Sequence, residues 1–222
     1  MLDIFDILGP VMVGPSSSHT AGAVRIGRMA RVLLGAAPVQ ADIGLYGSFA
    51  ETGQGHGTDR ALAAGLLGMR PDDLDIPRSL ELARERGLSV TFRTVRLREA
   101  HPNTALIRAE AADGRRIELQ AASTGGGRIR VDRLNGVDVN FTGAFHTLIV
   151  RHQDRAGKVA DVTRELSNAR VNIANMSLCR SRRGGDALMV IETDQPVPPV
   201  ARLLIGELPG IRSLTYYQRE ED

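Results

Sequence analysis

The spacing of apolar residues changes from strand-like to helix-like and back in the last third of the chain, and this feature restricts the fold more than any other. Apolar side chains alternate over 145–152, recur every three or four residues over 158–170, and alternate again over 171–182. Alternation predicts a half-buried strand, whereas spacing of three and four predicts an amphipathic helix. The segment therefore begins with a strand, a helix and a second strand.

The remaining part of this segment completes a pattern of six elements. Arg-Gly-Gly-Asp at 183–186 is a hairpin signal before the apolar run 187–192. Prolines precede the helical stretch 200–208, where proline is tolerated at a helix start, and Gly210 separates that helix from an apolar strand over 211–217. The order strand, helix, strand, strand, helix, strand predicts a ferredoxin-like βαββαβ domain.

The preceding 143 residues predict a second arrangement of helices and strands. Helices are expected over 21–35, 58–68 and 77–87, and strands over 41–49, 88–96, 104–111, 115–123, 127–134 and 135–142. Turn signals at 113–114 and 125–127 favour an antiparallel meander after residue 88. We therefore expect an α+β chain with one domain over 1–143 and the ferredoxin-like domain over 144–222.

Composition argues against a membrane or nucleic-acid role. Met1–Leu8 contains two aspartates and no basic residue, unlike a secretory signal, and no apolar run reaches the roughly 18 residues of a membrane span. Arginines alternate with acidic residues, and aromatic residues are 4%, so stacking platforms for bases are not expected. These features predict a cytoplasmic protein that binds neither membrane nor nucleic acid.

Two scarce residue types limit the chemistry of the chain. Cys179 is the single cysteine, and an iron–sulfur cluster takes several thiolates. Lys158 is the single lysine, and it opens a predicted amphipathic helix instead of lying in a site, which disfavours pyridoxal phosphate chemistry. Any cluster must therefore be held mainly by another chain.

The segment Gly14–Thr20 is the strongest candidate for a site. It reads Gly-Pro-Ser-Ser-Ser-His-Thr and precedes a predicted helix, with Ser18 or Thr20 as the expected N-cap. Backbone N–H groups, hydroxyls and a positive helix end would converge there on a carboxylate or phosphate, beside His19. An ordinary serine cap with an exposed histidine is the simpler interpretation, but a cap needs only one hydroxyl.

Two further segments carry histidines. A glycine-rich turn is expected over 51–57, and the segment Gly-Gln-Gly-His-Gly-Thr-Asp at 53–59, which runs from it into the next helix, leaves His56 open to a ligand, with Thr58 or Asp59 as the expected cap of that helix. It has no Walker lysine, so a nucleotide P-loop is rejected. His-Pro-Asn-Thr at 101–104 connects two strands, and its Asn103 is the better candidate for orienting a polar substrate.

The three segments occur in a specific order and resemble one family. Gly-Pro-Ser-Ser-Ser-His-Thr, Gly-His-Gly-Thr-Asp and His-Pro-Asn-Thr make residues 1–143 resemble the β subunit of iron–sulfur-dependent bacterial L-serine dehydratases, also called L-serine ammonia-lyases. Asp-Arg-Ala-Gly-Lys-Val at 154–159 and Asn-Ile-Ala-Asn-Met at 172–176 resemble an ACT regulatory domain. Ala156 departs from a frequent proline, and Gln54 stands where a basic residue is expected.

This resemblance implies a division of labour between two chains. A partner α subunit would hold a [4Fe–4S] cluster whose open iron binds the serine hydroxyl, and loss of water would give aminoacrylate, then pyruvate and ammonia. No metal is expected on this chain. His19 and His56 would be the catalytic residues, since a histidine pKa suits removal of the Cα proton. The implied substrate-binding residues, which would hold L-serine, are Ser16, Ser17, Ser18, Thr20 and Asn103.

Two other functions remain open at this point. The N-terminal domain is also similar to an allosteric substrate-binding domain of some phosphoglycerate dehydrogenases, which senses serine without catalysis, so a non-catalytic amino-acid sensor is the alternative. A hydrolase with a Ser–His pair is weaker, because the chain lacks a nucleophile elbow and an acid placed to orient His19.

The resemblance to ACT domains also implies regulation and assembly. ACT domains commonly pair side by side and bind small molecules near the first strand–helix turn, which makes Gly157 and Asn172 the candidate effector-binding residues. A four-stranded sheet leaves exposed edges, which favours a homodimer through this domain.

Overall fold

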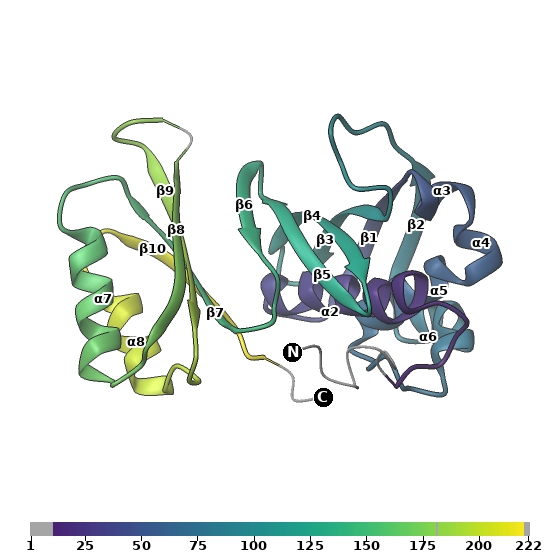
Figure 1. The fold of residues 1–222 in the computed structure, drawn as a ribbon, viewed down its shortest axis with the longest axis horizontal. Helices are drawn as coiled ribbons and strands as arrows, with labels where there is room; N and C mark the ends of the chain where they lie inside the picture. Colours follow the sequence, from purple (N-terminus) through teal and green to yellow (C-terminus); the bar gives the residue numbers. More distant parts are fainter. Residues whose placement is uncertain (1–10, 181, 220–222) are drawn as a thin grey trace, which may run out of the picture. The chain divides into compact units, whose positions relative to one another are not determined.

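The structure is a computed structural model that describes residues 11–180 and 182–219, without the side chain of Gln54. It forms two compact units that adjoin in the sequence between Gly136 and Val137. The expectations for Met1–Leu8 lie outside the described residues. Figure 1 shows both units, each with helices beside a sheet.

The first unit is built on a mixed sheet, whose last strand, β6 (Val137–Phe141), follows the division between the units in the sequence. Its strands follow the order β2-β1-β3-β4-β5-β6, with β1 and β2 parallel and the pairs β1–β3, β3–β4 and β4–β5 antiparallel. The strands are β1 (Pro38–Tyr46), β2 (Ser89–Thr94), β3 (Thr104–Ala111), β4 (Arg116–Gly125), β5 (Arg128–Leu134) and β6 (Val137–Phe141). The predicted meander is therefore correct for β3 to β5 but wrong for β2. Because the first strand inserts between β2 and β3, β2 pairs with β1 instead.

Helices cover one face of this sheet (Figure 1). Ile43, Ile107 and Leu119 are buried in the central strands, whereas the charged residues beside them in the sequence, Asp42, Arg108 and Glu118, are partly or fully exposed. The helical elements are η1 (Ser17–Gly22), α2 (Ala23–Leu34), α3 (Ser48–Glu51), α4 (Gly53–His56), α5 (Thr58–Leu67), η2 (Ile76–Arg78) and α6 (Ser79–Glu85). This is the half-buried α+β arrangement that the alternating pattern predicts.

Helices α2 and α5 cross with their backbones in close contact. A Cβ added to Gly27 would lie 2.3 Å from the carbonyl oxygen of Leu62, and one added to Gly65 would lie 2.1 Å from that of Val24. Only glycine fits at such distances, so the two glycines set how closely the helices approach. Arg31 donates across the crossing to the carbonyl oxygen of Leu66 at 2.8 Å.

The chain between β1 and α5 differs from the sequence prediction. The strand expected over 41–49 ends at Tyr46, because Gly47 has φ of 56° and lies against Pro102, where a Cβ would be 2.7 Å from the carbonyl oxygen. The short helix α3 begins within the last residues of the expected strand, and α4 lies within the turn expected over 51–57. Residues 48–56 therefore have helical spacing, with Ser48 one turn before Thr52.

Both helix caps lie at other residues than the sequence predicts. Ser16 is the N-cap of η1, instead of Ser18 or Thr20, because the helix begins with a π-turn inside the serine segment. Gly57, with φ of 69°, is the N-cap of α5, and no side chain caps that helix. Thr58 is fully buried, so its side chain faces the core instead of the helix end.

The second unit confirms the predicted ferredoxin-like order. Its elements are β7 (His146–Gln153), α7 (Lys158–Asn168), β8 (Ile173–Arg180), β9 (Asp186–Thr193), α8 (Pro199–Glu207) and β10 (Ile211–Tyr217). The sheet has the order β10-β7-β9-β8, and every neighbouring pair is antiparallel. One core joins the sheet to both helices through residues such as Leu148, Met189, Leu166 and Ile205.

The glycine crossing gives a test of the first unit. Gly65→Ala should lower its free energy of unfolding by about 1–3 kcal/mol, because the added methyl group forces the helices apart. Gly206→Ala is the control, since its Cβ would meet no atom within 4 Å on exposed α8. That change should raise the stability of the second unit by up to about 1 kcal/mol. Hydrogen exchange measured by mass spectrometry reports each unit separately, and unchanged protection of α2 and α5 in Gly65→Ala would contradict the close crossing.

Candidate functional site

The serine-rich segment forms the first turn of a long helix. Ser16 has an extended backbone, and its Oγ accepts a hydrogen bond from the backbone N–H of His19 at 3.2 Å. Residues Ser17–Gly22 form a π-helix that continues into α2. A π-turn is rare and is frequently found at functional sites. It leaves the side chains of Ser17 and Ser18 partly exposed beside His19.

Small residues allow this turn to sit close to the sheet. A Cβ on Gly14 would lie 2.4 Å from Oγ1 of Thr20, and one on Gly22 would lie 2.1 Å from Oγ of Ser123. The hydroxyls of Thr20 and Ser123 are buried and have no hydrogen-bond partner within the described residues. Of the hydroxyl residues predicted to hold substrate, Thr20 therefore points into the protein, whereas Ser16, Ser17 and Ser18 are accessible.

The ring of His19 is held on both edges. Its Nδ1 lies 3.4 Å from Oγ of Ser16, and its Nε2 lies 3.1 Å from Oγ1 of Thr52 and 3.3 Å from Oγ of Ser48. The buried ring of Phe49 contacts it edge-on, with centroids 5.2 Å apart. Four side chains therefore fix the position of one imidazole.

His56 joins His19 from a different helix. Their ring centroids are 5.0 Å apart, and Nδ1 of His56 lies 3.1 Å from the backbone carbonyl oxygen of Thr52. His56 is exposed, and the part of the chain that the structure describes offers no hydrogen-bond partner to its Nε2. The structure thus brings together the two histidines that the sequence predicts as catalytic.

Burial and the second histidine change the acid–base behaviour of His19. Partial burial lowers the pKa of His19 most, and the nearby charge of His56 lowers it further, while a hydrogen bond to the backbone of Ser48 opposes both. The sign follows from the charged form, which burial and a like charge both disfavour. The ring therefore stays neutral, and able to accept a proton, at lower pH than an ordinary histidine.

The His101–Asn103 loop lies beside this cluster and contacts it through the backbone. The backbone N–H of Phe49 donates to the carbonyl oxygen of Pro102 at 3.5 Å, and the carbonyl oxygen of Asn103 accepts from the N–H of Ser123 at 2.9 Å. The N–H of Asn103 donates to Nδ1 of His101. Asn103 is therefore connected to the cluster indirectly, through the hydrogen bond between the preceding residue, Pro102, and Phe49.

The two predicted effector residues lie at opposite ends of α7. Gly157 is the N-cap of this helix with φ of 90°, and Asn172 follows its last turn. Eleven helical residues separate them by roughly 16 Å. Asn172 donates a hydrogen bond to Oδ2 of Asp194. At this separation from Gly157, one small molecule could not touch both residues within one chain.

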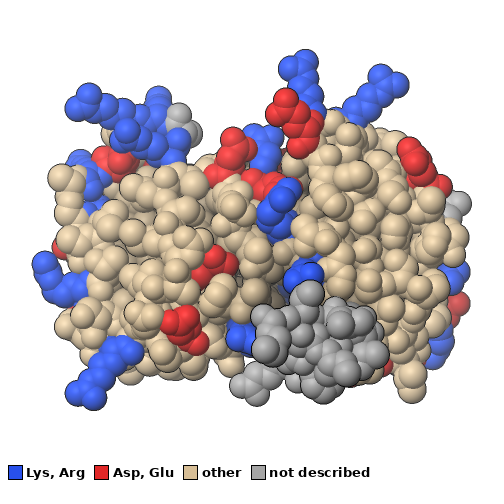
Figure 2. Space-filling model, in the orientation of Figure 1, with Lys and Arg blue, Asp and Glu red and all other residues tan. Residues whose placement is uncertain are grey.

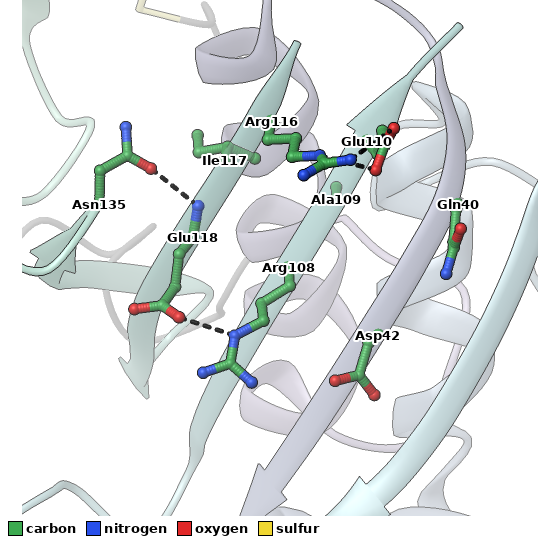
Figure 3. Close-up of a pocket in the computed structure, with 9 residues that line it drawn as sticks. All are labelled: Gln40, Asp42, Arg108, Ala109, Glu110, Arg116, Ile117, Glu118 and Asn135. Atoms are coloured by element: carbon green, nitrogen blue, oxygen red, sulfur yellow. Dashed lines mark hydrogen bonds and ion pairs between the residues drawn. The ribbon is translucent and has the colours of Figure 1, made fainter. Parts of the chain in front are cut away.

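A pocket lies on the face of the first sheet that carries the charged residues (Figure 3). Its charges are paired: Arg108 with Glu118 at 2.7 Å, Arg116 with Glu110 at 2.8 Å, and Asp42 with Arg93 at 2.9 Å. Its lining residues are Gln40, Asp42, Arg108, Ala109, Glu110, Arg116, Ile117, Glu118 and Asn135. None belongs to the predicted site, and a face whose charges neutralise each other offers no strong ligand preference.

Other features of the described residues carry less chemistry. Basic side chains gather at the tip of the β8–β9 hairpin, where Arg180, Arg182 and Arg183 are exposed (Figure 2). Arg180 is paired with Asp154 at 3.0 Å. Among the described residues no group of three His, Cys, Asp or Glu could hold a metal ion, and no helix is long and apolar enough to cross a membrane. Cys179 is half-buried on β8.

Sequence reasoning missed Ser48 and Thr52, which complete the histidine cluster. The error follows from the strand predicted over 41–49, which placed Ser48 in the strand and Thr52 in the turn. Gly47 was the available signal, because a glycine with positive φ can end a strand and allow the next residues to become helical. The four-residue spacing of the two hydroxyls then places both on one helical face.

Comparison with known proteins agrees with this architecture. The sequence model of the family described as serine dehydratase beta chain matches residues 1–87, and that of the ACT domain matches residues 146–210. The first match covers η1, which carries His19, and α4, whose last residue is His56. Fold and site together therefore define a serine dehydratase-type chain with an ACT domain.

Individual proteins resemble the chain over most of its length. A protein of Bacillus subtilis described as a probable L-serine dehydratase, beta chain, is 42% identical over 212 residues, 96% of this chain and 96% of that protein. The L-serine dehydratase beta chain of Peptoniphilus asaccharolyticus is 36% identical over 87% of both chains. The D-3-phosphoglycerate dehydrogenase of Archaeoglobus fulgidus is 27% identical over 88% of this chain but only 37% of that protein. The chain belongs to the serine dehydratase β-chain family.

The proximity of the histidines gives a second test. His56→Gln should raise the pKa of His19, because it removes one positive charge, but the pKa should stay below its ordinary value because burial persists. Proton NMR titration of the His19 ring measures this change. Arg60→Gln, which removes an exposed charge one turn beyond His56, is the control and should leave the titration unchanged. An unaltered titration in His56→Gln would mean that the rings do not interact as described.

Proposed function

We propose that this chain supplies substrate-binding and acid–base groups for the dehydration of L-serine to pyruvate and ammonia. The observation that carries the proposal is the contact between His19 and His56, with centroids 5.0 Å apart, beside the accessible serines of a helix start. Dehydration removes a proton from Cα and the hydroxyl from Cβ, so it requires a proton acceptor near an anchored carboxylate. The two helix starts provide both.

The anchoring groups are the first turn of η1. Ser17 and Ser18 are partly exposed, and the helix end adds unpaired backbone N–H groups and a positive dipole. Their hydroxyls and N–H groups would bind the carboxylate of L-serine, and Asn103 would border the same site. Thr20 contributes through packing beneath the turn, because its hydroxyl is buried.

We further propose that the reaction needs a partner α subunit. The single cysteine and the absence of a metal-binding group among the described residues do not fit a cluster held by this chain. The family resemblance supports the proposal that the partner would hold a [4Fe–4S] cluster, whose iron would bind the serine hydroxyl. The residues of this chain would bind, orient and deprotonate the substrate, with residues 1–143 as the domain that joins the active site and 144–222 as the regulatory domain.

The proposal predicts that neither chain alone forms pyruvate. The complex, made anaerobically with a cysteine-rich α partner, should form pyruvate from L-serine. His19→Gln or His56→Gln should lower kcat by about 100-fold to 10,000-fold, because each removes an acid–base group. Arg60→Gln is the matched control and should keep wild-type kcat. Iron content and cluster absorbance must equal those of the wild-type complex.

Two results would contradict this function. Full turnover by both histidine variants with the cluster intact would exclude acid–base roles for these rings. Binding of L-serine to the chain without any effect of the chain on pyruvate formation would favour the amino-acid sensor, which the partial similarity to the Archaeoglobus dehydrogenase keeps as the alternative.

We propose that the second unit forms a homodimer through β8. This strand is at the edge of its sheet and exposes Met176 and Leu178, 38% and 47% accessible. Antiparallel pairing of two β8 strands would bring the start of one beside the end of the other. Arg180 at the end of β8 pairs with Asp154, near Gly157, so Asn172 of one copy would approach Gly157 of the other. An effector site could then form from both copies.

The dimer gives a separate measurement. Sedimentation equilibrium should show twice the chain mass of 23.9 kDa, and Leu178→Asp should shift the population to the single mass, because it places a charge in an apolar contact. Leu74→Asp is the control, since Leu74 is exposed in the first unit. A wild-type chain of single mass at all concentrations would exclude the dimer.

A further inference from the structure

We infer that Thr52 is a positioning residue that holds the two histidines in opposite tautomers, with His19 protonated on Nε2 and His56 protonated on Nδ1. Thr52 lies between the rings and contacts each with a different group: its hydroxyl faces His19 and its backbone carbonyl faces His56. The inference rests on the proposed function only where it concerns turnover.

The hydroxyl of Thr52 has one proton, and the helix already uses it. Oγ1 of Thr52 donates to the carbonyl oxygen of Ser48, one turn earlier, at 2.9 Å. A threonine hydroxyl that donates elsewhere can only accept from a third group. Towards His19, Thr52 is therefore a hydrogen-bond acceptor.

An acceptor at this position requires a proton on Nε2 of His19. Oγ1 of Thr52 lies 3.1 Å from that nitrogen, and the backbone of Ser48 also acts as an acceptor for the ring, which is the cause that raises the pKa of His19. A lone pair on Nε2 would instead face the acceptor oxygen of Thr52. The competing donor is the hydroxyl of Ser48, 3.3 Å from the same nitrogen, and it donates to Oγ1 of Thr52, 3.4 Å away, instead of to the ring. The neutral ring consequently has its lone pair on Nδ1, 3.4 Å from Oγ of Ser16.

The backbone carbonyl of Thr52 determines the other ring. A carbonyl oxygen only accepts, and it lies 3.1 Å from Nδ1 of His56. The proton of neutral His56 is therefore on Nδ1, and its Nε2 is the lone pair. Since His56 is exposed, this nitrogen is open to a ligand, whereas the basic nitrogen of His19 faces Ser16.

Nitrogen-15 NMR of the full chain tests the tautomers without any partner or turnover. The chain has five histidines, so His19→Gln and His56→Gln variants assign the two rings. At about pH 8, where ordinary imidazoles are neutral, long-range proton–nitrogen spectra distinguish a protonated from an unprotonated ring nitrogen. His19 should show protonated Nε2 and His56 protonated Nδ1. The opposite tautomer for either ring would overturn the inference.

Two substitutions separate the hydroxyl from the carbonyl of Thr52. Thr52→Val keeps the shape and the carbonyl but removes the hydroxyl, so His19 should shift towards a mixture of tautomers while His56 stays unchanged in the same spectrum. Thr52→Ser restores the hydroxyl and should restore the wild-type His19 signals. An unchanged His19 tautomer in Thr52→Val would exclude the positioning role.

The activity of the complex with the α partner tests whether Thr52 also affects turnover. Thr52→Val should lower kcat by roughly tenfold to 100-fold, the scale of a misplaced catalytic group, with little change in KM, and Thr52→Ser should recover it. Unchanged kcat in Thr52→Val despite an altered tautomer would overturn the role in turnover. Failure of the proposed function would appear differently, as wild-type tautomers in a chain that never supports pyruvate formation.

Discussion

The close crossing of α2 and α5 is the constraint on which the histidine cluster depends. Gly27 and Gly65 let the two backbones touch, and each histidine precedes its own crossing glycine by roughly two helical turns. The two helix starts therefore emerge at the same side of the crossing. Larger residues at either glycine would separate the helices and, with them, the rings of His19 and His56.

A second constraint acts where the chain leaves β1. Gly47 ends the strand because its positive φ and its contact with Pro102 leave no room for a side chain. The chain then forms α3 and α4, which bring Ser48 and Thr52 to one edge of the His19 ring and the ring of His56 to a centroid distance of 5.0 Å from it. The loop at His101–Asn103 contacts this turn through Pro102.

Much of the fold could be predicted from periodicity, because burial on one face imposes it. The bounds of β3 and β10 and the full order of the second unit follow from alternation and turn residues. The place of β1 between β2 and β3 could not be predicted, since pairing depends on tertiary contacts that alternation does not report. The π-turn at Ser17–Gly22 was missed for a similar reason: it depends on the close contact of Gly22 with Ser123, which is far away in the sequence.

The site was predictable in its residue types and not in its hydrogen bonds. The histidines and serines stand out because such groups cluster at helix starts, whereas Thr52 acts through a hydroxyl whose proton is committed to Ser48. That single proton decides which nitrogen of His19 can accept another. Oγ of Ser16 accepts a hydrogen bond from the backbone N–H of His19, and its own proton can be donated to Nδ1 of the ring. One hydroxyl therefore both caps the helix and contacts the basic nitrogen. A carboxylate that accepted the hydrogen bond of the Ser16 hydroxyl would leave Nδ1 without it, which would couple substrate binding to the basicity of His19.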